Sequence, residues 1–229
     1  VHGDIVLPMV GAQDHKRAFD NDEGPNTGGM GAYSPVPQFD QASVQEAVDT
    51  ILQPMANAMI SEGRSFTGIL YAGLMMTASG PKVIEFNARF GDPETQVVLP
   101  RLKTDLTDVI NGLLDGNAVE LEWSDEAVLG VVMASKGYPL EYDKGAIIEG
   151  LDTVEEDTLV FHAGTKQSSG HFVTNGGRVL FVARRGTDLK LAQEKVYEEI
   201  KKIQSEGLFY RKDIGHKAIS HAFSSYINK

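Results

Sequence analysis

The fold is decided by the stretch Val83-Ile84-Glu85-Phe86-Asn87-Ala88-Arg89-Phe90-Gly91-Asp92-Pro93-Glu94-Thr95-Gln96. Its first apolar residues predict a buried strand, namely Val83, Ile84 and Phe86. Glu85, Asn87 and Arg89 alternate with them, and side chains two residues apart on a strand point to one face. Carboxylate and amide oxygens suit Mg²⁺, and a guanidinium binds a phosphate or carboxylate. The residues therefore predict a metal and anion site; the alternative is an edge strand with a solvated polar face.

Two motifs in this stretch resemble those of a known enzyme family. Glu-x-Asn-x-Arg, from Glu85 to Arg89, is similar to the metal and phosphate signature of the ATP-grasp enzymes. The octapeptide of residues 89–96 resembles the signature of the phosphoribosylamine–glycine ligase family within that superfamily. The same resemblance extends to Gln-Asp-His-Lys-Arg at residues 13–17 and to the glycine-rich residues 24–35. It also includes Gly-Tyr-Pro and the Arg-Lys-Asp-Ile-Gly near the end, so it covers essentially the whole chain.

Composition excludes several classes of protein. Of the 229 residues, 41% are hydrophobic and 23% are charged, which is typical of a globular protein. The formal net charge of -11 disfavours nonspecific binding to nucleic acid. The absence of cysteine excludes disulfides and thiolate metal sites, and no apolar run has the length of a membrane span. We therefore expect a soluble, cytoplasmic protein that has no nucleic-acid or membrane partner.

The chain begins at Val1, and residues 4–10 predict a strand that is already under way, after a turn at residues 2–4. We therefore expect a fragment that enters a domain from its middle. The resemblance implies that the amine-substrate domain and the ATP-grasp lid of the family lie upstream of Val1. The expected macromolecular partner is the chain's own missing N-terminal half.

Residues 20–37 are dense in glycine and proline, which predicts a long functional loop with no regular helix. Gly28, Gly29 and Gly31 can bring backbone N–H groups against an anion. Before the loop, Lys16 and Arg17 suit a polyanionic substrate. His15 is either a base or, more commonly for such a position, a hydrogen-bonding loop residue.

The remaining pattern predicts helices and short strands. A helix at residues 40–62 is expected to begin at Ser43 as N-cap, to be kinked or divided at Pro54 and to end at Gly63. A strand at residues 67–77 should pair antiparallel with the motif strand, and a helix follows at 97–114 with Thr104 as cap. Further strands are expected at 127–134, 147–148 and 159–163, and a hairpin at 172–182 turns at Asn175-Gly176. Helices are expected at 189–203 and 216–227.

Together these patterns predict an α+β fold. Residues 1–120 would form the C-terminal part of an ATP-grasp domain, an antiparallel sheet with helices. An acidic linker would lead into a small β-rich C-terminal domain at residues 126–229.

The resemblance implies an ADP-forming carbon–nitrogen ligase of purine biosynthesis, whose small-molecule substrates are ATP, glycine and 5-phosphoribosylamine. Glu85 and Asn87 would hold Mg²⁺ or Mn²⁺. The catalytic residues would be Arg89, Lys16 and Asp92. The substrate-binding residues would be Asp14, Arg17, Asn26, Thr27, Gly28, Gly29, Gly31, Glu94 and Arg211. We expect the motif strand and the segments at 14–17 and 28–31 to meet in the fold.

The sequence departs from the family pattern in one respect, because residues 70–74 lack the additional metal-binding carboxylate that many ATP-grasp enzymes carry on that strand. Metal coordination by the protein would then be sparse. Because the lid would lie upstream, we expect the isolated chain to be inactive. Two alternatives remain: another ATP-grasp ligase or carboxylase of purine metabolism, and a non-catalytic module that binds a nucleotide or metal.

Overall fold

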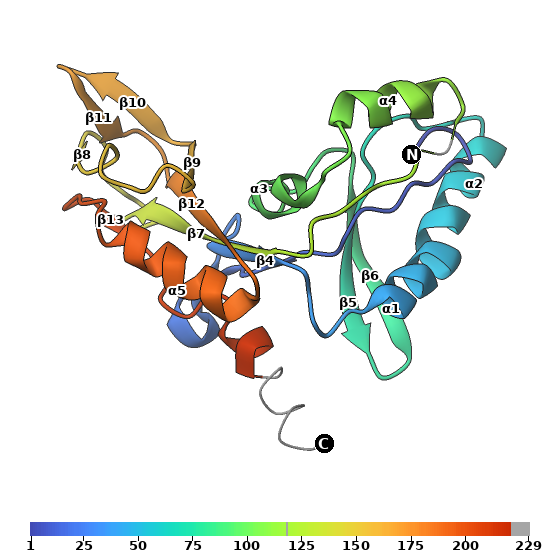
Figure 1. The fold of residues 1–229 in the computed structure, drawn as a ribbon, viewed down its shortest axis with the longest axis horizontal. Coiled ribbons are helices and arrows are strands. Elements are labelled where there is room, and N and C mark those ends of the chain that lie inside the picture. Colours follow the sequence, from blue (N-terminus) through green and yellow to red (C-terminus); the bar gives the residue numbers. More distant parts are fainter. Residues whose placement is uncertain (118, 221–229) are drawn as a thin grey trace. The chain divides into compact units, whose positions relative to one another are not determined.

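The computed structural model describes residues 1–117 and 119–220, and the chain divides into two compact units (Figure 1). The first unit comprises Val1–Gly11, Val36–Gly91 and Leu102–Ser124. The second comprises Ala12–Pro35, Asp92–Arg101 and the chain from Asp125 onward. Each unit is thus assembled from separated segments, whereas the boundary between residues 120 and 126 remains a prediction from sequence.

A β-hairpin and a helical segment build the first unit (Figure 1). Strands β5 (Tyr71–Thr77) and β6 (Gly80–Asn87) pair antiparallel, and Gly80 turns the chain with a φ of 88° that suits glycine. The predicted hairpin is confirmed, although its first strand begins at Tyr71 because Thr67 instead forms a bridge with His2.

The helix predicted at residues 40–62 comprises α1 (Gln41–Ala47), the π-type turn η2 (Val48–Leu52) and α2 (Gln53–Ser61), and α1 contacts β6. The predicted division near Pro54 is confirmed, since this proline lies in the first turn of α2, where its missing N–H is tolerated. The predicted cap was wrong. Asp40 is the N-cap, and its carboxylate accepts from the Ser43 backbone N–H at 2.9 Å.

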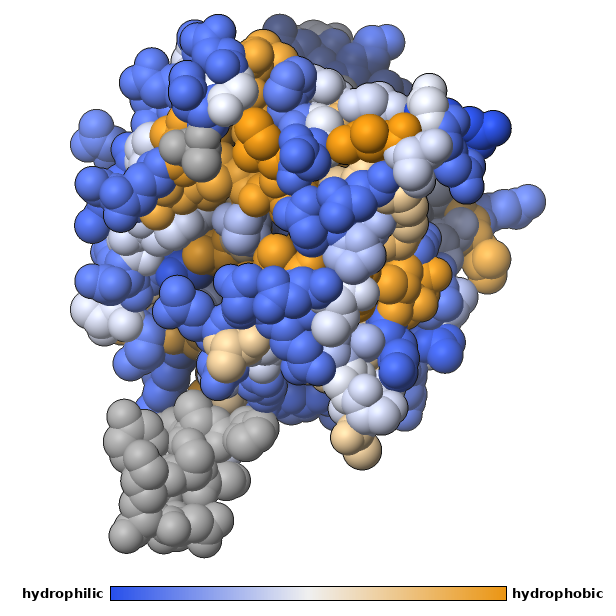
Figure 2. Space-filling view, turned by 90° about the vertical axis from the view of Figure 1, so that its right-hand side faces the viewer, coloured by the Kyte–Doolittle hydropathy of each residue, from blue (hydrophilic) through white to orange (hydrophobic). Residues whose placement is uncertain are grey.

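The motif strand is not buried as predicted. Val83 and Ile84 are 43% and 63% exposed, and Met75 and Met76 of the paired strand are also exposed. Figure 2 shows hydrophobic residues at the surface between hydrophilic ones. The apolar pattern predicts a covered face, but the described residues do not cover this one.

The rest of the first unit contains one more helix, α4 (Leu106–Leu114), whose N-cap is Asp105 and not the predicted Thr104. The short carboxylate of Asp105 reaches the Thr107 N–H at 2.7 Å, while Thr104 bonds to Glu120 and Glu122. Near the N-terminus, His2 and Ile5 form the predicted turn, but the expected strand at 4–10 is absent from the described chain. In the described chain, no strand pairs with residues 4–10.

An antiparallel sheet forms the core of the second unit, in the order β1-β4-β7-β12-β9, with β13 also paired to β7. Its strands are β1 (Gln13–Asp14), β4 (Gly31–Ser34), β7 (Ala127–Ser135), β9 (Leu159–His162), β12 (Arg178–Gly186) and β13 (Leu208–Phe209). Two smaller sheets pair β2 (Arg17–Phe19) with β3 (Glu23–Asn26), and β10 (Thr165–Ser168) with β11 (His171–Thr174) and β8 (Ile147–Ile148).

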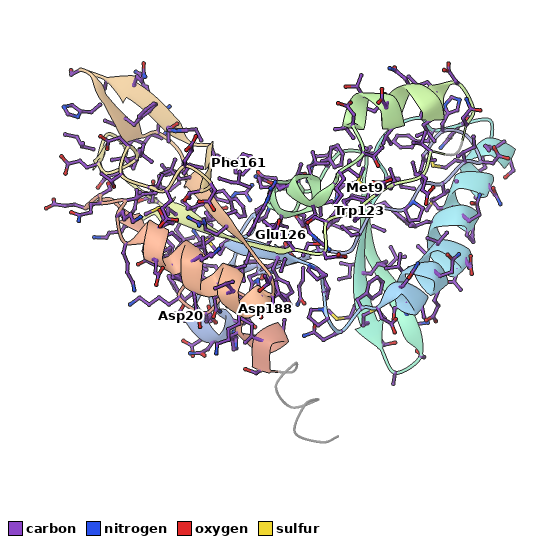
Figure 3. All side chains as sticks on the ribbon, viewed as in Figure 1. Met9, Asp20, Trp123, Glu126, Phe161 and Asp188 are labelled. Atoms are coloured by element: carbon purple, nitrogen blue, oxygen red, sulfur yellow. The ribbon has the colours of Figure 1, made fainter. Side chains whose placement is uncertain are left out.

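Helices cover both faces of this core sheet (Figure 1). Helix α5 (Leu189–Ile200) contacts β7 and β12. The short helix α3 (Thr95–Val98), which continues into η3 (Leu99–Arg101), contacts β4 and β7. All residues of β7 are consequently buried, which agrees with its unbroken apolar sequence. Asp188 is the N-cap of α5: it lies at the helix start in Figure 3 and accepts from the Leu191 N–H at 2.8 Å.

Two predictions for the second unit were wrong. Residues 20–37 are not one long loop, because they contain the turn η1 (Asp20–Asp22), β3 and the fully buried strand β4, which finds its partner in the distant β7. The predicted hairpin at residues 172–182 does not form, since β11 and β12 belong to different sheets. Its Asn175-Gly176 turn would need positive φ angles, which neither residue has.

Near the C-terminus, residues 216–220 are helical, and the rest of the helix predicted at 216–227 lies outside the described residues. None of the helices in the described part of the chain is long and apolar enough to cross a membrane.

We expect Gly130→Ala to destabilise the second unit by roughly 2–3 kcal/mol, because overpacking a core displaces its neighbours. A Cβ at this position of β7 would lie 2.1 Å from Phe181 Cζ and 2.9 Å from Ala183 Cβ, both in the buried core. Urea unfolding would measure the change. The matched control is Gly11→Ala, whose Cβ would meet Phe39 at an ordinary 3.4 Å; equal effects of the two variants would contradict the packing argument.

Candidate functional site

The end of β6 presents the predicted metal ligands. Asn87 Nδ2 donates to Glu85 Oε1 at 3.1 Å, which confirms that the two side chains share a face. Opposite Glu85 lies Gly73, and a Cβ there would approach Glu85 Cγ at 3.2 Å. Glycine on the neighbouring strand therefore leaves space beside the carboxylate. Arg89 is exposed just beyond the strand and donates to the Phe90 carbonyl at 2.9 Å.

The chemistry of this pair fits a hard divalent cation. The Asn87–Glu85 bond orients the amide so that its oxygen and the second Glu85 oxygen remain to bind an ion. Among the described residues, no group of three or more His, Cys, Asp and Glu side chains could hold a metal. That coordination by the protein is sparse remains a prediction.

In the second unit, residues 14–31, which include β2, η1 and β3, are joined by many internal hydrogen bonds. The His15 N–H donates to the Gly31 carbonyl at 2.9 Å, and the Met30 N–H donates to the His15 carbonyl at 2.8 Å. Thr27 donates to the Lys16 carbonyl through both its N–H and its hydroxyl, at 2.7 and 2.8 Å. The Lys16 ammonium forms an ion pair with Asp14. Lys16 is thus positioned by both backbone and side chain.

The glycine-rich segment is fixed by a residue that the sequence analysis missed. Arg178 Nη1 donates to the carbonyls of Gly28 and Asp92, at 2.7 and 2.9 Å, and its Nη2 donates to Asp92 Oδ2 at 2.8 Å. The Gly28 N–H donates to the Tyr138 hydroxyl at 3.0 Å. No motif in the sequence marked Arg178. It directly follows Asn175-Gly176-Gly177, which was interpreted only as a hairpin turn.

Other predicted residues have structural partners here. The second Asp92 oxygen accepts from Gln96 Nε2 at 2.7 Å. Glu94 is buried just before α3, and Asn26 pairs with Arg17 in the β2–β3 sheet. Gly31 lies in β4, where a Cβ would meet Ile214 Cδ1 at 2.8 Å. Glycine at that position is therefore required by packing.

Arg211 is buried in a network that fastens the loop to the end of the chain. Its guanidinium donates to the Arg17 carbonyl and Asp22 at 3.0 Å, and to both oxygens of Asp213 at 2.8 Å. Burial by itself raises the pKa of Asp213, but the hydrogen bonds from Arg211 and the Asn21 N–H outweigh it and hold that pKa at about 2. Asp213 is therefore ionised at neutral pH. A direct contact between Arg211 and substrate remains a prediction.

His15 does not have the properties of a general base at neutral pH. It is 6% exposed, and burial, aided by the Arg211 charge, lowers its pKa to about 4 despite the opposing effects of Asp22, Asp213 and Asp14. Its Nε2 accepts a long hydrogen bond of 3.4 Å from the Gly215 N–H. Nδ1 has no hydrogen-bond partner among the described residues. The geometry thus favours the structural interpretation of this histidine.

The structure brings the predicted residues together in two groups. Glu85, Asn87 and Arg89 belong to the first unit, whereas Asp92, Glu94, Arg211 and the residues of the 14–31 loop belong to the second. That the two groups meet remains a prediction.

Comparison with known proteins first defines the class of protein. Residues 1–95 match the ATP-grasp (A) domain of phosphoribosylglycinamide synthetase, and residues 128–217 match the C domain of the same enzyme. Biotin carboxylase from Campylobacter jejuni shares the fold, with a TM-score of 0.58 at 11% identity, over 79% of this chain and 40% of that one. The chain therefore has the α+β fold of an ATP-grasp protein, with the family's C domain.

The individual relatives then identify the family. Phosphoribosylamine–glycine ligase from Halalkalibacterium halodurans is 69% identical over 96% of this chain and 51% of the relative, and that from Listeria innocua is 54% identical over 95% and 52%. The crystal structure of phosphoribosylamine–glycine ligase from Thermotoga maritima aligns with a TM-score of 0.84 at 34% identity, over 93% of this chain and 53% of that one. The chain belongs to the phosphoribosylglycinamide synthetase family, and it spans about half the length of the curated relatives that it matches.

We expect His15 to make the free energy of unfolding depend on pH. Between about pH 6.5 and 4 the unfolded chain binds a proton at this histidine that the folded protein excludes, so stability falls as the pH falls, by up to roughly 1.4 kcal/mol per pH unit. Urea unfolding at several pH values gives the free energy of unfolding against pH. Between pH 6.5 and 4 this plot should be less steep for His15→Asn than for the wild type. The control is His162→Gln, at an exposed histidine of β9; unchanged slopes for His15→Asn would contradict the assignment.

Proposed function

We propose that this chain is part of an ADP-forming ligase that joins glycine to 5-phosphoribosylamine and yields glycinamide ribonucleotide, in purine biosynthesis. The observation that carries the proposal is the match of both ligase family models, one to residues 1–95 and the other to residues 128–217. The Asn87–Glu85 pair at the end of β6 supports it, because ATP-dependent ligation needs a site for the nucleotide's metal ion.

In the first step a glycine carboxylate oxygen attacks the γ-phosphorus of ATP, and ADP leaves. Glu85 and Asn87 would hold Mg²⁺ or Mn²⁺, which neutralises charge on the phosphate oxygens when it is bound. Arg89, exposed two residues beyond Asn87, would stabilise charge on the transferred phosphoryl group. The product of this step is glycyl phosphate.

In the second step the amine nitrogen of 5-phosphoribosylamine attacks the acyl carbon of glycyl phosphate, and phosphate leaves. We assign the binding of the amine substrate's phosphate, or of glycine, to Lys16, Arg17 and the segment that carries the glycines at 28, 29 and 31. The N–H groups of Gly28 and Gly29 already donate to Tyr138 and Thr27, so these two glycines would shape the segment. Asp14, which is paired with Lys16, would orient that ammonium. Thr27 would hold the loop through its bonds to Lys16 and Gly29.

The other predicted residues have supporting roles in this proposal. Asp92 and Glu94 would orient the cations or the attacking amine, and Asn26 would support the loop through its pairing with Arg17. We also propose that the protein is cytoplasmic. We further propose that it binds ATP together with an N-terminal half that corresponds to the remaining length of the relatives.

We expect Glu85→Ala in the full-length protein to lower glycine-dependent ADP release by roughly 10²–10³-fold. The variant removes a ligand of the metal ion that would neutralise charge on the transferred phosphoryl group. A coupled assay for ADP measures the rate, and a chelator should abolish it in the wild type. The control is Lys82→Ala, an exposed residue of the same strand. Turnover with bicarbonate or formate in place of glycine would reject the proposed acid substrate.

We expect residues 1–229 alone to form ADP only at the background rate, because the relatives are about twice as long and the clamp on the nucleotide would lie in the remaining half. The same coupled assay, run at equal concentrations of this chain and the full-length enzyme, checks this. Near-full turnover from the isolated chain would overturn the expectation.

A further inference from the structure

We infer that Arg178 is a positioning residue, which fixes the glycine-rich segment at Gly28 and Gly29 against the turn at Asp92 and Pro93. The inference rests on the proposed function for the meaning of that segment as a substrate-binding element. Arg178 itself is assigned no contact with substrate.

The contacts of Arg178 join two parts of the chain that are far apart in sequence. Its Nη1 holds the carbonyls of Gly28 and Asp92 at 2.7 and 2.9 Å, and its Nη2 holds the Asp92 carboxylate at 2.8 Å. The Arg178 side chain is 23% exposed and that of Asp92 is 55% exposed, so the ion pair alone contributes little, and the positioning depends on the three bonds that one guanidinium makes together. One planar guanidinium therefore sets the distance between the two segments.

Close packing leaves the two segments little freedom to shift. A Cβ on Gly29 would lie 2.5 Å from Pro93 Cδ, and a Cβ on Gly28 would lie 2.9 Å from the guanidinium carbon of Arg178. The glycines thus allow the backbone to approach both the turn and the arginine. The motif needs glycine here partly for this approach, in addition to any anion that the segment binds.

The anchor of Arg178 is the core sheet. The residue begins β12 and pairs with Ala134 of β7. Just before it, the Gly177 carbonyl accepts from the Ser135 N–H at 2.8 Å. The Tyr138 ring packs closely against Gly177, since a Cβ on this glycine would lie 2.2 Å from Tyr138 Cδ2. Tyr138 in turn accepts the Gly28 N–H through its hydroxyl. Both side chains that hold Gly28 are therefore supported by the same rigid strands.

Arg178→Lys tests the role, because an ammonium is a single point charge and cannot span the acceptors that Nη1 and Nη2 hold. In the full-length enzyme we expect the KM for glycine or for 5-phosphoribosylamine to rise roughly 10- to 100-fold, since a displacement of about 1 Å in a positioning element has effects of that size. The KM for ATP should stay within about twofold, as should the KM values of the control Arg185→Lys, which lies on the same strand and donates to the Pro100 carbonyl.

Amide hydrogen exchange supplies a readout that is independent of turnover. We expect faster exchange at Gly28 and Gly29 in Arg178→Lys and unchanged exchange in β7. If Arg178→Lys fails to fold, Arg178→Gln keeps a side-chain amide donor without the guanidinium fork and should accelerate exchange at the same two glycines. Unchanged exchange at these glycines, or a uniform loss of activity without a selective KM effect, would overturn the inference. Absence of glycine-dependent turnover in the wild type would reject the proposed function instead, and the exchange comparison would still decide the role of Arg178.

Discussion

The pairing of β7 along both of its edges is the constraint on which the second unit depends. Strand β4 pairs with one part of β7, β13 pairs near its end, and β12 runs along its whole length. Because every residue of β7 is buried, hydrogen bonds to its backbone must come from neighbouring strands and not from water. This requirement draws residues 31–34 and 178–186 to the same strand and, with them, the loops that they carry.

The sheet therefore assigns motif residues to a compact unit that does not follow the order of the chain. The ATP-grasp domain match ends at residue 95, yet residues 12–35 within it lie in the second unit with the C domain. Arg178 and Tyr138 both lie in the part that matches the C domain. They hold Gly28, which lies in the part that matches the ATP-grasp domain.

Buried arginines perform a related task in a chain of net charge -11. Arg101 donates to Ser34 and to the Glu126 carbonyl, and Arg184 joins Asp157 to the end of β12. Arg211 holds Arg17 and Asp22 of the loop. Each donates to a group far away in sequence. Arg101 fixes η3 to β4, Arg184 fixes the segment at residue 157 to β12, and Arg211 fixes the segment at residues 17–22 to the end of the chain. Losing Arg101 or Arg211 would leave a backbone carbonyl without its side-chain donor, which is costlier than the net gain from forming the contact.

Sequence alone indicated the family, through the resemblance of its motifs. It also determined the hairpin that carries Glu85 and Asn87 and the shared face of these two side chains, because both depend on local spacing along a strand. It did not determine which strands pair. Residues 31–34 are rich in small residues and appeared as a loop, and only the distant β7 makes them a strand. Asn175-Gly176 had the composition of a hairpin turn, yet the separate sheets pull the two strands apart. Arg178 escaped notice for the same reason: its importance lies in contacts with residues 150 and 86 positions away, and only tertiary structure brings such groups within hydrogen-bonding distance.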